Sequence, residues 1–137
     1  YRGVGPVEAG SVTFDQLPSK TRKFLRKHCN GRAVVRCDKV FTTGQYNLEL
    51  ADGIRFEFDK KGNVIETAAP EGYSLARPLL RAVVPGKFYH LLIHNGLDQC
   101  VDRVEHTADK YRVDVDDPVF SSVLYGKDGV LTLVTSD

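Results

Sequence analysis

The stretch YNLELADGIRFEF, residues 46–58, decides the fold of this chain. Apolar and polar side chains alternate up to Leu50, pass through Asp52-Gly53 and alternate again from Ile54. A two-residue period is typical of a strand with one covered face, and Asp-Gly is a strong signal for a hairpin turn. We therefore expect two antiparallel strands joined by this turn. The apolar side holds Tyr46, Leu48, Leu50, Ile54, Phe56 and Phe58, and the polar side holds Asn47, Glu49, Arg55 and Glu57.

An amphipathic helix is expected before this hairpin, over residues 14–30. Asp15 or Ser19 can cap its first turn, and Asn30-Gly31 can end it because both residues tolerate a left-handed backbone. The helical spacing of its less polar residues predicts one buried stripe. That stripe consists of Leu17, Thr21, Phe24, Leu25 and His28. Strands over 34–40 and from Val64 complete a meander of four strands.

The same unit is expected a second time in the chain. Matched positions recur with one compensated slip, which indicates a tandem duplication. Residues that match at a separation of 67 are Leu17 to Lys20 with Val84 to Lys87, Val34 and Cys37 with Val101 and Val104, and Lys61-Gly62 with Asp128-Gly129. Residues that match at a separation of 65 are Tyr46, Leu48, Leu50 and Asp52 with Tyr111, Val113, Val115 and Asp117.

The predicted fold is α+β: two copies of a helix plus a four-stranded antiparallel meander, forming one continuous sheet with helices on one face. Repeat one spans 12–67 and repeat two spans 84–137, with a second helix from Lys87 to Asn95. Residues 68–83 form a linker and a short helical insert, interrupted near Pro78. Pro118 replaces the hairpin glycine, so we expect its strand to be irregular or at an edge.

The charge balance limits the classes of function that this chain can have, and the absence of methionine concerns how the chain starts. The chain has nineteen Lys and Arg and eighteen Asp and Glu, which gives a net charge of +1. This balance argues against binding nucleic acid by bulk charge. No apolar run reaches the roughly 18–20 residues that cross a bilayer. The chain contains no Met, so we expect a processed or trimmed start at Tyr1. Removal of a signal peptide and a trimmed boundary both explain it.

Three cysteines, Cys29, Cys37 and Cys100, are too few for a disulfide scaffold and include no Cys-x-x-Cys pair. We favour three reduced, buried thiols over one bridge plus a free thiol. His28-Cys29 does not indicate a catalytic thiol, because adjacent helix residues point in different directions.

No catalytic, metal or cofactor motif emerges. His90 and His94 have the i, i+4 spacing of a metal pair but lack a third ligand, so an ordinary helix face is expected. Residues 59–63 lack the ligand spacing of a calcium loop and predict a plain turn. The basic cluster on the first helix is expected to be a solvated face, with a docking patch as the alternative. It consists of Lys20, Arg22, Lys23, Arg26 and Lys27.

The uncovered sheet face is the remaining candidate site. Its predicted residues alternate in sign, which suits cross-strand ion pairs on a soluble surface and also suits recognition of a polar partner. They are Arg36, Glu49, Arg55, Glu57, Arg112 and Asp114.

Three stretches carry a resemblance to a known family: Phe14 to Pro18 before a basic helix, Tyr46 to Gly53, and Phe56 to Asn63. Together they resemble the PepSY-like, β-lactamase-inhibitor-like family of small exported proteins of Gram-negative bacteria. The resemblance covers 12–66 well and 84–135 loosely, and it departs at Asp117-Pro118 and Tyr125-Gly126. It implies a duplicated helix-plus-sheet fold, a periplasmic or secreted location after signal removal, and binding rather than catalysis; fold alone does not set function.

We therefore expect a non-enzymatic envelope protein that binds a protein or peptide, for example to modulate a hydrolase, across its open sheet face. The alternative is a small-ligand carrier with a pocket between helix and sheet, near Tyr46, Phe56 and Tyr111. The residues leave the partner's identity and the oligomeric state open.

Overall fold

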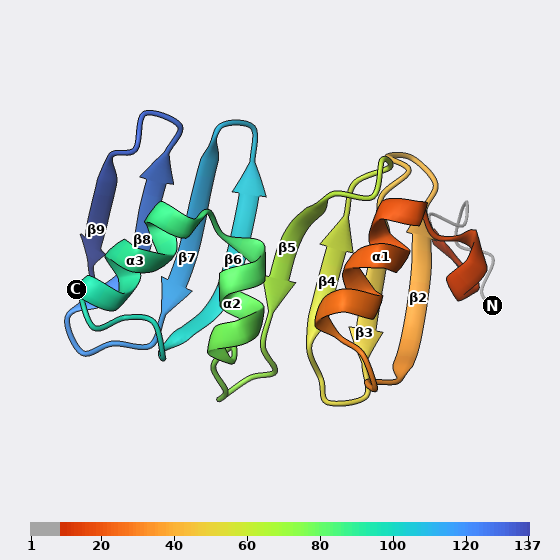
Figure 1. The fold of residues 1–137 in the computed structure, drawn as a ribbon, viewed down its shortest axis with the longest axis horizontal. Coiled ribbons are helices and arrows are strands. Elements are labelled where there is room, and N and C mark those ends of the chain that lie inside the picture. Colours follow the sequence, from red (N-terminus) through yellow and green to blue (C-terminus); the bar gives the residue numbers. More distant parts are fainter. Residues whose placement is uncertain (1–8) are drawn as a thin grey trace.

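The computed structural model describes residues 9–137, which form one antiparallel sheet of nine strands with each strand beside its sequence neighbours (Figure 1). The fold is the predicted α+β arrangement. The strands are β1 (Ala9–Ser11), β2 (Val34–Val40), β3 (Tyr46–Leu50), β4 (Arg55–Phe58), β5 (Val64–Ala68), β6 (Val101–Thr107), β7 (Lys110–Val115), β8 (Phe120–Gly126) and β9 (Leu131–Thr135).

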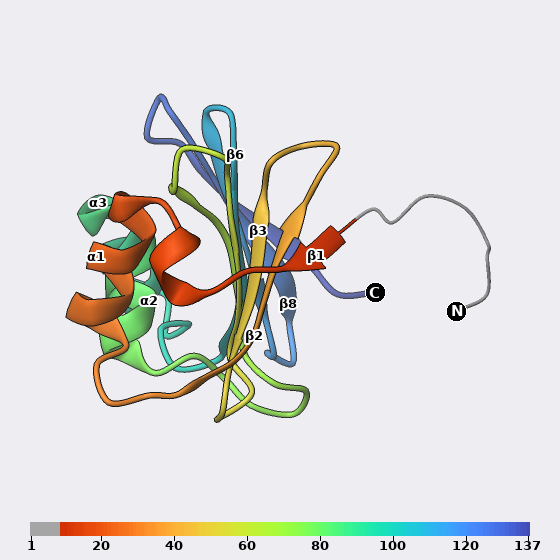
Figure 2. The same ribbon diagram turned by 90° about the vertical axis from the view of Figure 1, so that its right-hand side faces the viewer.

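Three α-helices cover one face of the sheet and leave the other face open, as the side view in Figure 2 shows. They are α1 (Ser19–His28), α2 (Arg77–Val83) and α3 (Gly86–His94), and a short 3-10 turn, η1 (Phe14–Gln16), precedes α1. A helix followed by four strands thus occurs twice, and β5 pairs with β6 to join the two halves. The limits of the repeats, 12–67 and 84–137, stay a prediction.

The first helix is shorter than predicted. Leu17 and Pro18 have extended backbones, with ψ of 151° and 148°, and separate η1 from α1. The residue before a proline is pushed out of the helical region, and Pro18 is then suited to begin the next helix. Neither Asp15 nor Ser19 caps α1 with its side chain, because Pro18 occupies the cap position.

Prolines also set the limits of the next two helices. Pro78 lies in the first turn of α2, so it begins this helix instead of interrupting it, contrary to the prediction. Proline is tolerated there because the first N–H groups of a helix have no partner within it. Pro85 separates α2 from α3, which starts and ends one residue earlier than predicted.

The core lies between the helices and the sheet, and its largest members are aromatic. Phe56, Phe58 and Phe88 are fully buried. The Phe24 ring meets Phe56 edge-on at a centroid distance of 5.6 Å, and Phe88 stacks on Tyr125 at 4.8 Å. Each such burial contributes about 1.5–3 kcal/mol relative to an exposed side chain. The predicted apolar side of residues 46–58 is buried throughout.

One feature at the ends of the sheet was not predicted, and another agrees with prediction. β1 was not expected; it pairs with β2, and the Phe41 ring lies so close to Gly10 that a Cβ there would be 2.7 Å from it. β8 is irregular as predicted, with a register shift between Phe120 and Ser122, but it is not an edge strand. The last strand, β9, takes the edge because the meander continues past β8.

Candidate functional site

The face of the sheet without helices, here called the open face, carries its charged side chains in rows that cross the strands. In the first row, Arg36 on β2 lies opposite Glu49 on β3, and Glu49 lies opposite Arg55 on β4. Directly opposed charges of unlike sign stabilise a sheet modestly, by about 0.2–1 kcal/mol a pair. Beyond β5 the same row continues through Arg103 opposite Asp114.

The second row lies two residues farther along each strand and is more acidic. Asn47 lies opposite Glu57, Glu57 opposite Glu66, and Glu66 opposite Glu105. Glu105 in turn lies opposite Arg112 on β7. Three carboxylates therefore occupy neighbouring positions on β4, β5 and β6, where the two halves of the sheet join.

Four of the six predicted site residues surround one hollow in the open face. Arg36, Glu49, Arg55 and Glu57 line a depression of about 230 Å³ over β2, β3 and β4. Arg36 also pairs along its own strand with Asp38, at 2.8 Å from Nε to Oδ2, and this hydrogen bond raises the pKa of the guanidinium. The remaining lining residues are Asn47, Leu48, Phe56 and Glu66.

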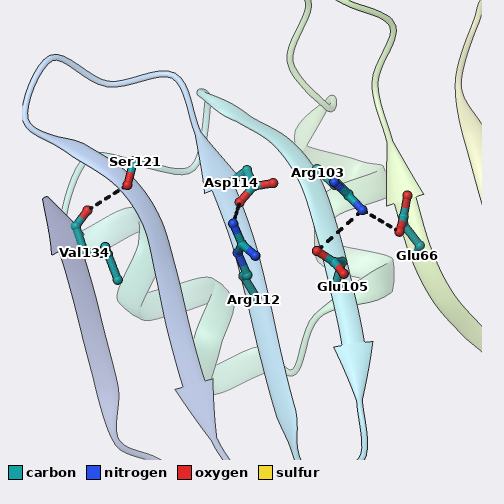
Figure 3. A network of polar contacts seen from close by, with 7 residues as sticks. All are labelled: Glu66, Arg103, Glu105, Arg112, Asp114, Ser121 and Val134. Atoms are coloured by element: carbon teal, nitrogen blue, oxygen red, sulfur yellow. Dashed lines mark hydrogen bonds and ion pairs between the residues drawn. The ribbon is translucent and has the colours of Figure 1, made fainter. Parts of the chain in front are cut away.

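The other two predicted residues lie elsewhere on the open face. Arg112 and Asp114 are on β7, beyond β5 and β6, and pair with each other at 3.1 Å between Nη2 and Oδ1 (Figure 3). Neither lines the hollow. The structure therefore divides the predicted site into a hollow in the first half and an ion pair in the second.

A charge cluster between these two places was not predicted. The Arg103 guanidinium lies between two carboxylates, with Nη2 at 2.9 Å from Glu66 Oε1 and 3.6 Å from Glu105 Oε1 (Figure 3). The hydrogen bond to Glu66 is the main cause that raises the pKa of Arg103. This cluster bridges β5 and β6 and thus ties the two halves of the sheet together.

This cluster was not predicted because the alternation of buried and exposed side chains is interrupted in β6. The register shifts between Val101 and Arg103, so that Val101 and Val104 are both buried although they are three residues apart. The internal repeat could have indicated that Arg103 and Glu105 lie on the open face. Arg103 and Glu105 follow Arg36 and Asp38 by 67 positions, the offset at which other positions of the two halves match.

One carboxylate of the second row, Glu57, has a raised pKa. Partial burial, followed by the charge of Glu66, raises the pKa of Glu57, and Arg103 offsets part of this rise. Within residues 9–137, Glu57 forms no ion pair, whereas Glu66 pairs with Arg103. Glu57 is thus a half-buried carboxylate in the hollow that lacks a cation of its own.

The other candidates are ordinary surface or core residues. His90 and His94 are exposed on α3, and the described residues contain no group of three His, Cys, Asp or Glu that could hold a metal. In the turn at 59–63, Asp59 accepts hydrogen bonds from the backbone N–H groups of Lys61 and Asn63. On α1, Lys20, Lys23, Arg26 and Lys27 are exposed, and Arg22 donates Nε to the Leu17 carbonyl.

The cysteines are free thiols, with Cys29 buried and Cys37 and Cys100 half-buried. Burial raises the pKa of all three and brings that of Cys37 to about 11. A thiol is a nucleophile only as the thiolate, so these side chains are poorly suited to covalent catalysis at neutral pH.

The helix side of the sheet has an open cleft but is filled where a ligand pocket was expected. Phe56 and Tyr46 are buried in the core. The third residue of that prediction, Tyr111, lines a surface cleft of about 450 Å³ together with Phe24 and Ala82. His106 stacks on the Tyr111 ring at 4.0 Å in one wall of this cleft. None of the described helices is long and apolar enough to span a membrane.

Comparison with known proteins finds similarity of structure only. No family profile and no curated protein matches the sequence. Among solved structures, a proposed periplasmic protein of the DUF2874 family from Bacteroides vulgatus is 19% identical with a TM-score of 0.76, covering 97% of this chain and 100% of its own.

Two further solved structures have the same architecture. One, a proposed periplasmic protein of unknown function from B. vulgatus, is 21% identical with a TM-score of 0.73 and covers 94% of this chain and 99% of its own. The other, a proposed calcium-regulated periplasmic protein from Bacteroides thetaiotaomicron, is 19% identical with a TM-score of 0.74 and covers 94% and 97%. This chain thus has the fold of these small bacterial proteins, over nearly its whole length.

Proposed function

We propose that this protein is a non-enzymatic component of the cell envelope that binds a protein or peptide through the hollow in its open face. The observation that carries the proposal is the uncovered hollow of about 230 Å³, surrounded by Arg36, Glu49, Arg55 and Glu57. Interfaces use such patterns of alternating charge to select a partner and to set its orientation.

The free carboxylate defines one property of the partner. Glu57 lacks a cation within residues 9–137, and its neighbour Glu66 adds to the negative potential of that side of the hollow. A Lys or Arg side chain from a partner would relieve the repulsion between these carboxylates. We therefore expect a partner that presents a basic side chain to Glu57 and an acidic one to Arg36 or Arg55.

The proposed location in the cell envelope is supported by similarity to other proteins. Structural neighbours of the same fold are described as periplasmic, and the sequence resembles the PepSY-like, β-lactamase-inhibitor-like family of exported proteins. Removal of a signal peptide and modulation of a hydrolase belong to this proposal as well. A non-catalytic role is consistent with the high pKa of the thiols and with the fully bonded Asp59 turn.

Photo-crosslinking tests the site directly. A photoreactive residue at Asn47, which is exposed and lines the hollow, should give a discrete product in envelope extract, and the same residue at Lys23 on α1 should not. The product should be lost when Arg36→Glu and Arg55→Glu are added. Equal labelling from both positions, or a product that survives both charge reversals, would contradict the proposal.

The second candidate function is that of a small-ligand carrier, with the ligand in the surface cleft instead of the core. The stacked His106–Tyr111 pair gives the cleft a flat aromatic wall, and burial raises the pKa of Tyr111, so its hydroxyl stays neutral. Anilinonaphthalene sulfonate should bind saturably, and Ala82→Phe should abolish that binding by filling the cleft. Unchanged fluorescence with the variant would remove this candidate.

A further inference from the structure

β9 forms one edge of the sheet. β9 is the last strand in the sheet order, so within residues 9–137 no strand pairs with its outer side. Proteins normally protect such edges with short strands, charges or prolines, because unpaired N–H and C=O groups recruit another strand. At the opposite end of the sheet the edge strand is β1, whose described part spans Ala9–Ser11.

β9 has none of these protections. It has five residues, and neither a charge nor a proline occurs between Gly129 and Ser136. Its surroundings are apolar as well, since Val130 is 57% exposed at one end of the strand and Val119 is 55% exposed beside the other end. Leu131 and Leu133 are half-buried at the margin of the core. An edge of this composition favours pairing.

Hydrogen bonds of the β8–β9 pair show which backbone groups are free. Gly126 N–H donates to the Val130 carbonyl, and Ser136 N–H donates to the Val119 carbonyl. The backbone groups of even-numbered residues therefore point toward β8, because the direction alternates along an antiparallel strand. Those of Leu131, Leu133 and Thr135 therefore point to the free edge, away from β8.

We propose that β9 pairs with β9 of a second copy of this chain, antiparallel and centred on Leu133. In this register Leu133 lies opposite Leu133, and Leu131 lies opposite Thr135 on either side. All three residues then exchange hydrogen bonds, and no other register uses all three within β9. The strand is self-complementary in this sense and brings no like charges together.

The symmetry follows from the pairing. The two-fold axis is perpendicular to the sheet, as expected for an isologous contact in which one patch meets itself. The helices of both copies therefore lie on one face of a continuous sheet, and both open faces lie on the other. Thr132 of one copy would lie opposite Val134 of its partner on the open face. A contact between two five-residue strands is smaller than the interfaces of most permanent dimers. We therefore expect the dimer to dissociate at about micromolar concentration.

Sedimentation velocity tests the proposal with charge-swapped variants. The unmodified chain should show a monomer–dimer equilibrium. Thr132→Lys with Val134→Lys should weaken it about tenfold or more, because lysines would face each other across the axis. Mixing this variant with Thr132→Glu/Val134→Glu should restore a heterodimer, which also shows that both variants fold. Thr42→Lys, an exposed position away from β9, should have no effect.

Hydrogen exchange gives an independent readout without substitution. The amides of Leu131, Leu133 and Thr135 should exchange slowly at high protein concentration and rapidly on dilution, whereas those of Thr132 and Val134 should stay protected by β8 at both. A monomer at all concentrations up to about 200 µM, on the order of a hundred times the expected dissociation constant or more, would overturn the proposal. So would a dimer that withstands the paired lysines.

Discussion

The two halves of the open face are alike at most positions of β2 and β3 against β6 and β7, apart from Asn47 against Arg112, and unlike on their last two strands. Arg36 and Asp38 on β2 correspond to Arg103 and Glu105 on β6, and Glu49 on β3 corresponds to Asp114 on β7. On β4 and β5, however, three of the four open-face positions are charged where β8 and β9 have uncharged side chains, and the fourth, Ala68, is uncharged in both halves. By register, Arg55, Glu57, Glu66 and Ala68 correspond to Ser122, Leu124, Thr132 and Val134.

This difference assigns separate roles to the two halves. The charged strands β4 and β5 are interior to the sheet, and with β2 and β3 they form the hollow. The uncharged strands β8 and β9 lie at an edge, where charge would repel an incoming strand. We infer that the first half is suited to a polar partner and the second half to strand pairing.

The largest effect should come from the core, which tests whether the halves form one unit. Phe56→Ala and Phe88→Ala should each lower the free energy of unfolding by about 3–5 kcal/mol, because both rings are fully buried. Since β5 pairs with β6, each variant should lower hydrogen-exchange protection in both halves. Loss of protection confined to the mutated half would show that the halves unfold independently.

An effect of about 1 kcal/mol is expected at Thr67, the position that corresponds to Leu133 of the second half. Its Oγ1 is buried and lacks a hydrogen-bond partner among the described residues. Thr67→Val keeps the shape and should raise stability by about 1 kcal/mol in urea unfolding. Thr21→Val is the matched control and should lower it by a similar amount, because Thr21 Oγ1 donates to the Gly62 carbonyl at 3.2 Å. Equal signs would contradict this assignment.

The smallest effect concerns Glu57, where the second half has Leu124. The pKa of Glu57 is raised above its usual 4.5, so the folded state holds this proton more tightly than the unfolded state. Its contribution to stability is therefore present at acid pH and is lost as pH rises through the folded pKa.

Glu57→Gln should raise the stability at pH 7 by about 0.5 kcal/mol, the size of a relieved cross-strand repulsion. The gain should shrink as pH falls toward 4.5, which urea unfolding at a series of pH values can measure. Glu49→Gln is the control and should not stabilise, because Glu49 lies between Arg36 and Arg55. A gain from Glu57→Gln that does not change with pH would contradict the electrostatic cause.

Much of the architecture was predictable because its signals are local. Alternation and the Asp52-Gly53 turn predicted β3 within its observed limits and β4 to within one residue. Prolines were harder to interpret. Pro78 begins α2 where an interruption was expected, and Pro18 directly precedes α1, which was expected to start at residue 14. A proline's effect depends on whether a helical turn already precedes it, because a carbonyl of that turn would then lack the N–H that proline does not have, and the local pattern does not show this.

The candidate site was predicted in part. Arg36, Glu49, Arg55 and Glu57 share one hollow because they alternate on adjacent strands joined by short turns, where register follows from the turn. Arg103 was missed because an extra residue in β6 shifts the alternation, and such irregularities arise from pairing with the neighbouring strand.

The sequence by itself determined which side of the regularly alternating strands is covered, since apolar side chains at every second position must leave water together. Only the tertiary structure decided that Glu57, Glu66 and Glu105 stand side by side and that β9 ends the sheet. The contact of Glu66 with Glu105 joins segments far apart in the chain. Its register depends on the helices packed behind both strands, which no local pattern specifies.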